Sequence, residues 1–236
     1  MTEPSERLIV IPARGGSKRL PRKNVLPLAG KPLICWTIEA ALETGLTARI
    51  MVTSDDEEIL SIARRYADRG LIAHKRPAEL ATDHATTADV LKEALDADQQ
   101  AGYSAKTLIL LQPTSPLRSA EDIRAAVETY EHSGSGDTVV SVCEVDHPTA
   151  WIGTISDSGH LKGVDLTGKR SQDYRKEYRL NGAVYVTAEK TLRETGRLFT
   201  DSVRAWVMPK ARSIDIDEAV DFRICEHLIK TMAIKA

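Results

Sequence analysis

A short segment near the start of the chain combines adjacent glycines with a high density of positive charge. Between Arg14 and Asn24 it carries Gly15, Gly16 and five cationic side chains within ten residues. Adjacent glycines let a backbone approach a ligand closely, and the exposed amide groups can form a nest that binds anions. Cations at this density repel one another unless water or an anion separates them, so a polyphosphate is a natural ligand. A solvated basic loop fits the same composition.

Two carboxylates near the other end of the chain have a spacing that suits a metal ion. Asp215 and Asp217 alternate with isoleucines in the run Ser213–Asp217. On an extended chain, residues two apart share a face, so both carboxylates point one way. Mg²⁺ takes oxygen ligands and commonly binds one or two carboxylates together with substrate phosphates. We therefore predict a Mg²⁺ site at this pair, although Asp217 alone also suits the N-cap of a following helix.

Two further polar segments, Arg76–Asp83 and Gln112–Arg118, each follow a short apolar run. Open parallel sheets bind ligands at the carboxyl ends of their strands, and Gln112 stands at the end of a strong predicted strand. The threonines after the first segment also have a structural explanation, because Thr86 and Asp89 have the offset of a helix capping box.

Spacing excludes several familiar sites. The basic loop matches neither the G-x-G-x-x-G pattern of dinucleotide-binding proteins nor the G-x-x-x-x-G-K-[ST] pattern of P-loop enzymes. No Ser–His–Asp or Cys–His nucleophile is evident, and the six histidines and three cysteines show no metal-ligand spacing.

Apolar runs and amphipathic segments alternate along the first half of the chain. Three runs read as strands that are buried on both faces: Leu8–Ile11, Ile50–Val52 and Thr107–Leu111. Helices are predicted between and after them, one behind a capping pair of Ser54 and Glu57 and another behind Ser119. The alternation predicts an α/β fold, a Rossmann-like three-layer sandwich with a mostly parallel sheet.

The connection after the first strand is long. That strand should end near Pro12 and the next helix cannot start before about Pro32, which leaves roughly twenty residues where 2–6 are usual. Such a connection is normally functional or disordered, and the glycines and cations of this one favour function.

The second half is less regular. Residues from about 146 to 182 are polar and weakly periodic, so we expect a single domain over 1–236 with an extended arm there. Order returns in two predicted strands, Ala183–Val186 and Ala205–Met208. A closing helix is expected from Asp217 to about Met232, with three apolar residues facing inward: Val220, Ile224 and Leu228.

Together the motifs resemble those of the CMP-sialic acid synthetases (acylneuraminate cytidylyltransferases), from about Arg7 to Phe222. The matching runs are Ile11–Lys18, Leu20–Asn24, Arg76–Asp83, Leu111–Arg118, Arg170–Asp173, Tyr178–Tyr185 and Asp215–Asp217. The resemblance implies an enzyme that couples CTP to a nine-carbon 2-keto sugar acid (N-acetylneuraminic, legionaminic or similar) and releases pyrophosphate.

The resemblance also assigns roles to residues. Nucleotide contacts are implied for Arg14, Gly15, Ser17, Lys23, Asn24, Arg76 and Thr87. Sugar contacts are implied for Gln112, Thr114, Ser115, Arg170, Arg179, Asn181 and Tyr185. Catalysis is implied for Arg14, Lys23, Asp215 and Asp217, with Mg²⁺ held by the two aspartates. Arg170 carries a one-residue ambiguity in spacing, and a surface arginine is the alternative for it.

In the family the polar arm pairs two subunits and completes the neighbour's sugar site, which implies a homodimer. One departure concerns a lysine that some relatives carry after the dipeptide matching His147-Pro148, because this chain has Ala150 there. Lys169 or Arg170 would then have to supply the missing cation.

Bulk properties restrict the class of protein further. The net charge is −2, with 32 basic and 34 acidic residues spread along the chain, so neither a nucleic-acid partner nor a membrane surface is expected. Residues Met1–Arg7 are polar and lack the apolar core of a signal peptide, and we expect a cytoplasmic protein with reduced cysteines.

Two alternatives remain open at this point. One is a cytidylyltransferase for KDO or a nucleotidyltransferase for a sugar 1-phosphate, against which the basic loop and the Gln112 motif argue. The other is a catalytically silent nucleotide-binding protein, against which the intact pair of Asp215 and Asp217 argues.

Overall fold

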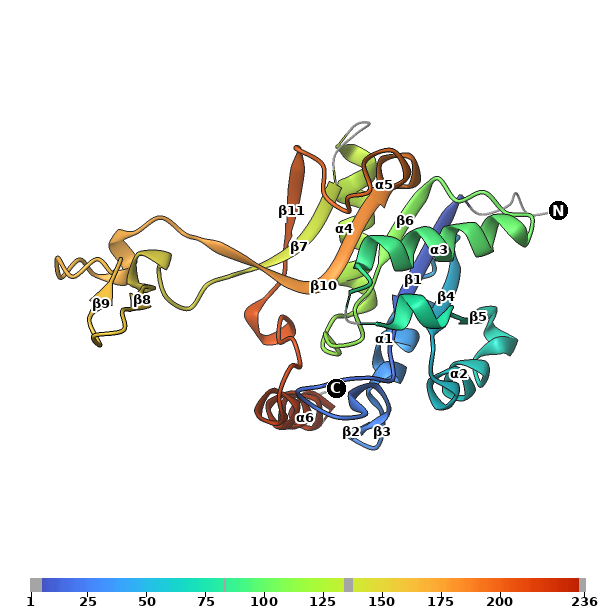
Figure 1. Ribbon diagram of the computed structural model, residues 1–236, viewed down its shortest axis with the longest axis horizontal. Coiled ribbons are helices and arrows are strands. Elements are labelled where there is room, and N and C mark those ends of the chain that lie inside the picture. Colours follow the sequence, from blue (N-terminus) through green and yellow to red (C-terminus); the bar gives the residue numbers. More distant parts are fainter. Residues whose placement is uncertain (1–5, 83, 134–137, 234–236) are drawn as a thin grey trace.

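A seven-stranded sheet forms the centre of the protein in the computed structural model, which describes residues 6–82, 84–133 and 138–233 (Figure 1). The strand order is β11-β7-β10-β6-β1-β4-β5, and all strands except β10 run parallel to one another. The strands are β1 (Arg7–Pro12), β4 (Arg49–Ser54), β5 (Leu71–Lys75), β6 (Thr107–Leu110), β7 (Thr138–Glu144), β10 (Tyr178–Ala188) and β11 (Val203–Val207). The predicted α/β class is therefore confirmed.

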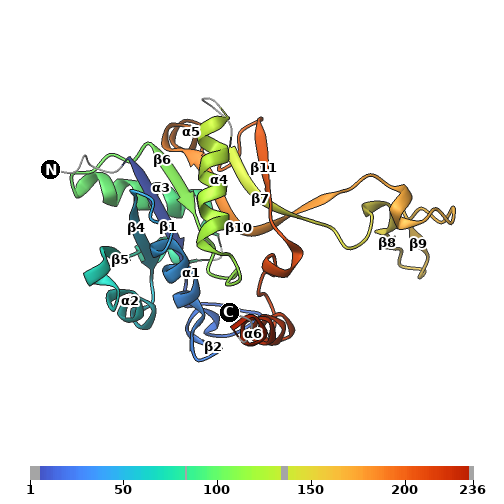
Figure 2. The ribbon, with the colours of Figure 1, turned by 180° about the vertical axis from the view of Figure 1, so that it is seen from behind.

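Helices cover both faces of this sheet. They are α1 (Leu33–Leu42), α2 (Glu57–Arg64), α3 (Thr87–Gln100), α4 (Ala120–His132) and α5 (Glu189–Thr195). A sixth helix, α6 (Ala219–Ala233), packs beside the sheet in a separate apolar cluster. Along β1, Ile9 and Ile11 pack into the core beneath α1, α2 and α4, whereas Leu8 and Val10 pack beneath α3 and α5. Figure 1 shows α3 in front of the sheet, and Figure 2, from behind, shows α1 and α4. All four side chains are fully buried, as predicted for a strand covered on both faces.

The predicted helix starts are partly right. Two capping boxes are present as expected, with Thr86 and Asp89 at α3 and with Ser119 and Asp122 at α4. At α2 the predicted pair of Ser54 and Glu57 is wrong. The N-cap is Asp56, whose carboxylate accepts from the amides of Glu58 at 3.0 Å and Ile59 at 3.1 Å. Ser54 instead accepts from the amide of Asp56, so it orients the cap and does not form it.

The chain leaves the sheet between β7 and β10 and forms the projecting part of the molecule in Figure 1. It contains a small antiparallel hairpin of β8 (Thr154–Ile155) and β9 (Leu161–Lys162). The strand β7, which the sequence analysis missed, and β10 lead out of and back into the sheet. The projecting part exposes several apolar side chains: Ile152, Ile155, Leu161, Leu166, Tyr178 and Leu180.

The closing helix was predicted with a start two residues early. Of the three residues expected to face inward, Leu228 packs against the buried cluster as predicted, and the prediction is wrong for the other two. Val220 and Ile224 are 48% and 45% exposed, while Cys225 and Ile229 are buried. The buried pair packs with Leu28, from β2 (Pro27–Leu28), which pairs with β3 (Lys31–Pro32) in the long connection after β1. The sequence of α6 has two sets of apolar residues at helical spacing, and contact with the β2–β3 hairpin determines which set is buried. None of the helices in the described ranges is long and apolar enough to cross a bilayer.

Candidate active site

An open pocket of about 570 Å³ lies at the carboxyl ends of β1, β5 and β6. It is bordered by the basic loop after β1, by the segments after β5 and β6, and by the carboxylate run before α6. Most of the residues predicted from the motifs line it: Arg14, Ser17, Lys23, Asn24, Arg76, Thr87, Gln112, Thr114, Asp215 and Asp217. Segments from both ends of the chain thus meet at the edge where an open parallel sheet binds ligands.

The basic loop is held against the start of α2. The amide of Gly15 donates to Asp55 Oδ1 at 3.1 Å, and Arg22 forms ion pairs with Asp56 and Glu58. A Cβ on Gly15 would lie 2.6 Å from Asp56 Oδ2, so a larger residue here would displace the Asp56 side chain from its place. Gly15 therefore shapes the loop and does not itself line the pocket.

Two cations of the loop reach the carboxylate run. Lys23 is buried, and its Nζ donates to the carbonyl of Ile216 and lies 3.5 Å from Asp217 Oδ1. Arg19 pairs with the other oxygen of the same carboxylate at 2.6 Å. The Asn24 side chain donates to the carbonyl of Arg14 at 3.1 Å, and its buried Oδ1 has no hydrogen-bond partner among the described residues.

The carboxylate run has the predicted alternation. Asp215 and Asp217 line the pocket, whereas Ile214 and Ile216 pack into the core beneath α6. Burial raises the pKa of Asp215, and the charge of Asp217 adds to the rise. The Asp217 carboxylate faces Arg19 and Lys23, and it is Asp221 Oδ2 that accepts from the amides of Asp217 and Glu218 at the start of α6.

These two aspartates suit a Mg²⁺ ion that also binds phosphate. Asp215 Oδ1 is buried and has no hydrogen-bond partner among the described residues. An ionised oxygen in that position is unfavourable unless a cation approaches it. No cluster of three or more acidic, His or Cys side chains surrounds the pair in the described part of the chain, so phosphate oxygens or water would complete the coordination.

On the opposite side of the pocket, Arg76 is tied to the backbone. Its guanidinium donates to the carbonyl of Thr53 at 2.7 Å and to that of Leu80 at 3.4 Å, and burial lowers its pKa. Thr87 is the first residue of α3, and the capping explanation applies to its neighbour Thr86. Asp83, which belongs to the same motif, lies outside the described residues.

The segment after β6 is anchored by a residue that the sequence analysis did not single out. Arg118 is 2% exposed and donates to the carbonyls of Gln112 at 3.2 Å and Ala183 at 2.8 Å, and to Thr37 Oγ1 at 2.6 Å. Burial without a carboxylate in hydrogen-bond contact lowers its pKa to about 9. Its place at the end of the Gln112 motif was the only signal for this role.

Gly182 was also missed as a residue of interest. It has a φ of +74°, and a Cβ there would lie 2.7 Å from Gln112 Oε1 and 3.6 Å from Asp215 Oδ2. The strand β10 therefore passes directly between the glutamine and the carboxylate run. The Asn-Gly dipeptide before an apolar run was the available signal.

Five predicted sugar contacts do not line this pocket within one chain. Ser115 and Asn181 are buried in its wall, and Tyr185 packs against Phe199 beneath α5. Arg179 donates to the carbonyl of Ser213 at 3.3 Å, and Arg170 lies on the projecting part, 72% exposed and paired with Asp173. Direct contact of these five with a sugar stays a prediction, and their observed contacts are structural.

The sequence model of the cytidylyltransferase family matches residues 8–154. The chain belongs to this family. An N-acylneuraminate cytidylyltransferase of Streptococcus agalactiae is 39% identical over 97% of the chain, which spans only 54% of that protein. The chain thus covers about half the length of such relatives.

Other members of the family have a similar length. The CMP-N,N'-diacetyllegionaminic acid synthase of Legionella pneumophila is 37% identical, with 94% of this chain and 96% of that protein covered. The pseudaminic acid cytidylyltransferase of Campylobacter jejuni is 30% identical, with 95% and 97% covered. A CMP:2-keto-3-deoxy-manno-octonic acid synthetase solved with CTP shares the fold, with a TM-score of 0.72, 18% identity and 96% and 99% covered.

Proposed function

We propose that the chain transfers CMP from CTP to a nine-carbon 2-keto sugar acid. One observation carries the proposal: a single pocket places the basic loop, the Gln112 segment and the carboxylate pair within reach of one ligand. The names of the full-length relatives support this choice of nucleotide and of acceptor class.

In the proposed reaction, the anomeric hydroxyl oxygen attacks the α-phosphorus of CTP. The new phosphorus–oxygen bond forms as the bond to the bridging oxygen breaks, pyrophosphate leaves with the electron pair, and the hydroxyl proton is released. The protein contributes in-line positioning and charge neutralisation. Arg14 and Lys23, which line the pocket on the loop side, would stabilise the charge that develops on pyrophosphate.

Asp215 and Asp217 would hold Mg²⁺ beside the phosphates. The bound ion would neutralise phosphate charge and lower the pKa of the attacking hydroxyl. Lys23 contacts the backbone between the two aspartates and the carboxylate of the second, so it couples the loop to the proposed metal site.

The sugar acid is proposed to bind at the Gln112 and Thr114 side of the pocket. Its carboxylate needs a cation, and Arg179, which donates to the carbonyl of Ser213 in the carboxylate run, is the proposed partner. Arg has the planar fork that pairs with carboxylates.

We also propose that two copies associate through the projecting part. Its exposed apolar side chains include Ile155 and Leu166, which are 76% and 79% exposed. A second subunit would cover them and would bring the partner's polar side chains, including the counterpart of Arg170, toward the sugar side of the pocket.

Pyrophosphate release from CTP and Mg²⁺ tests the function. The acceptors should include N-acetylneuraminic, legionaminic and pseudaminic acids, with KDO and sugar 1-phosphates as controls. We expect turnover with at least one nine-carbon acid and little with the controls. Absence of turnover with every nine-carbon acid, from a folded protein, would contradict the proposal.

A further inference from the structure

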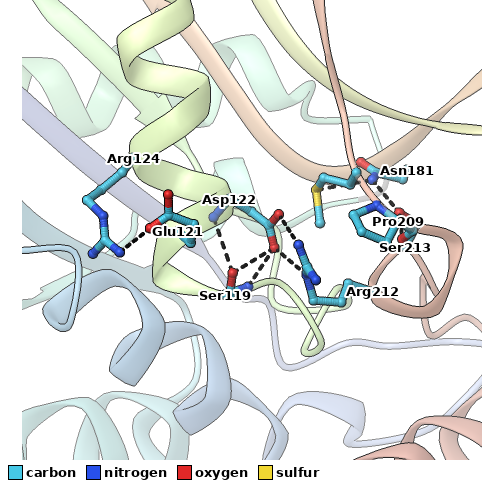
Figure 3. A network of polar contacts seen from close by, with 9 residues as sticks. Ser119, Glu121, Asp122, Arg124, Asn181, Pro209, Arg212 and Ser213 are labelled. Carbon is cyan, nitrogen blue, oxygen red and sulfur yellow. Dashed lines mark hydrogen bonds and ion pairs between the residues drawn. The ribbon is translucent and has the colours of Figure 1, made fainter.

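An ion pair joins the start of the carboxylate run to α4 (Figure 3). Arg212 donates from Nε to Asp122 Oδ2 at 2.9 Å and from Nη2 to Asp122 Oδ1 at 2.8 Å. The Asp122 side chain is 1% exposed, and Arg212 precedes Asp215 by three residues. Two parallel hydrogen bonds to a buried carboxylate fix both the position and the orientation of the arginine.

Asp122 is also linked, through Ser119, to the segment that carries Gln112. Its Oδ2 accepts from the Ser119 amide at 3.0 Å and from Ser119 Oγ at 2.9 Å, as Figure 3 shows. Ser119 follows Arg118, which donates to the carbonyl of Gln112. Burial acts to raise the pKa of Asp122, but hydrogen bonds from Arg212 and Ser119 outweigh it and lower that pKa. The carboxylate therefore stays charged and joins two segments of the pocket wall.

The rest of the carboxylate run is fixed by single hydrogen bonds to neighbouring segments. Asn181 donates to Ser213 Oγ at 2.9 Å, and Ser213 donates to the carbonyl of Pro209 at 2.9 Å (Figure 3). Beyond Asp215, the amide of Ile216 donates to the carbonyl of Thr114 at 2.7 Å. Asp215 thus sits between two anchored residues, and the ion pair holds the chain just before the first of them.

We propose that Arg212 and Asp122 are positioning residues for nucleotidyl transfer. Their ion pair sets the distance between the carboxylate run and the Gln112 segment, and neither residue lines the pocket. This inference rests on the function proposed above. Loosening the pair lets Asp215 move relative to Gln112, and a misplacement of about 1 Å remote from the chemistry can lower a rate by about 10²-fold.

The chain contains a matched control for this pair. Arg49 contacts Asp98 in the same bidentate manner, at 2.7 and 2.6 Å, and the Asp98 side chain is also 1% exposed. Arg49 starts β4, at the end of the sheet opposite the pocket. Losing this pair should therefore disturb folding energy to a similar degree without moving the site.

The experiment compares R212M, R212K and D122N with R49M, R49K and D98N. Each variant is measured for melting temperature, for kcat and the Mg²⁺ concentration at half-maximal rate, and for Mn²⁺ binding in the presence of CTP by electron paramagnetic resonance. We expect R212M to lower kcat about 10- to 100-fold and to weaken metal binding. R212K should recover part of both losses, because it restores the charge but not the fork. The R49M variant should have a lower melting temperature than the wild type but keep kcat within about 2-fold of it.

Two results would overturn the inference. One is normal kcat and metal binding in R212K and D122N, and the other is an equal loss of both in the Arg49 and Asp98 variants. If R212M does not fold, the comparison of R212K with R49K decides. If the wild type itself releases no pyrophosphate with any acid, the proposed function fails, while Mn²⁺ binding still tests the positioning role.

Discussion

Asp215 is the residue at which burial and function conflict most directly. Burial raises its pKa, the neighbouring charge of Asp217 raises it further, and one of its oxygens lacks a hydrogen bond within the described chain. A raised pKa means that the folded protein holds the neutral form better than the charged form. The charged form that a metal requires is therefore maintained at a cost to stability.

Replacing Asp215 by asparagine should separate these two effects. Above the ordinary carboxylate pKa, the neutral amide relieves the desolvation of the charge, so we expect an unchanged or higher melting temperature. Turnover should fall by at least about 10²-fold, the scale of losing one preorganised electrostatic contact. Melting curves and pyrophosphate release measure the two effects. The exposed Asp68→Asn variant serves as control, and near-normal turnover of D215N would remove Asp215 from the metal site.

Arg19 is expected to oppose metal binding, because its positive charge lies against a carboxylate proposed to hold a metal cation. Its side chain is 67% exposed and lies 2.6 Å from Asp217 Oδ2. Removing it with R19Q should tighten Mn²⁺ binding to the nucleotide-free protein about 2- to 5-fold, the range expected for one exposed ion pair. Titration with Mn²⁺ checks this, with R64Q, which removes the exposed Arg64–Glu57 pair, as control. Weaker binding in R19Q would show that Arg19 does not compete with the metal.

Residue types indicated which residues line the pocket more reliably than they indicated what each residue contacts. The loop cations and the two aspartates could be found because charge at that density needs a counter-charge. The positions of Asn181 and Tyr185 could not be predicted, because the same polar groups can bind a ligand or form hydrogen bonds within the wall of a pocket. Asn181 instead receives hydrogen bonds from Ser141 and Ala183 and donates to Ser213.

At the scale of elements, β10 brings the two sides of the pocket together. Its pairing with β7 shifts register between Leu180 and Tyr185, and Gly182 lies within this irregularity with a left-handed backbone. Such a bulge re-aims the chain beside a site. The bulge follows from pairing with β7 and β6, so the sequence of β10 alone could not reveal it.

A G182A variant should test the need for space at this point. The new methyl group would meet Gln112 Oε1, so we expect the KM for the sugar acid to rise by about tenfold, equivalent to ~1.4 kcal/mol, with the KM for CTP nearly unchanged. Steady-state kinetics with each substrate varied measures this. The G70A variant has a similar φ of +82° and no atom within 4 Å of its Cβ, so it carries the backbone strain alone. Equal kinetic effects in both variants would contradict the steric explanation.

The start of α4 should give the protein an acid-sensitive element. The pKa of Asp122 is lowered, so its contribution to stability is complete above the ordinary carboxylate pKa and is lost as the pH falls through the lowered value. We expect D122N to be less stable than the wild type by about 1–3 kcal/mol at pH 7. The gap should narrow below about pH 4. Urea unfolding of both proteins between pH 3 and 7 measures the gap, and a constant difference would argue against the linkage.

For the helices and strands, hydrophobic periodicity and capping residues were reliable signals. They could not decide between two apolar stripes with the same spacing on one helix. Both capping boxes followed from a Thr or Ser with an Asp three residues later. In α6, by contrast, Val220 and Ile224 had the same helical spacing as Cys225 and Ile229. Only the position of the β2 hairpin, a feature of the tertiary fold, selects the second stripe.

At the scale of the whole molecule, the projecting part has apolar side chains that a single chain leaves exposed to solvent. Large apolar side chains exposed together usually mark an interaction surface. The family resemblance suggested a homodimer through this region, and the exposed residues support the same proposal.

We therefore expect the wild type to be a dimer and the double variant I155D/L166D to be monomeric. Two charges on this surface oppose its burial against a second copy. Sedimentation equilibrium at several concentrations measures the mass. The I224D variant changes an exposed apolar residue of α6 and should leave the mass unchanged. A monomeric wild type, or an unaltered dimer in the double variant, would contradict the proposal.

The α/β class and the edge of the sheet that binds ligands could be predicted because strand and helix periods are local. The detailed arrangement of the pocket could not be predicted, because its residues range from Arg14 to Asp217. Only the order of the strands in the folded sheet brings them together. The antiparallel course of β10 and the parallel edge strand β11 are long-range choices of this kind.

The course of β10 also limits how sequences of this fold can change in length. One continuous strand runs from Tyr178 at the base of the projecting part, past Asn181 and Gly182, to Ala188 before α5. Because Tyr178–Leu180 pair with β7 before the irregularity and Tyr185–Ala188 pair with β6 after it, inserting or deleting one residue before Gly182 would shift one of these two registers. Insertions and deletions are thus expected to be excluded from this part of the strand.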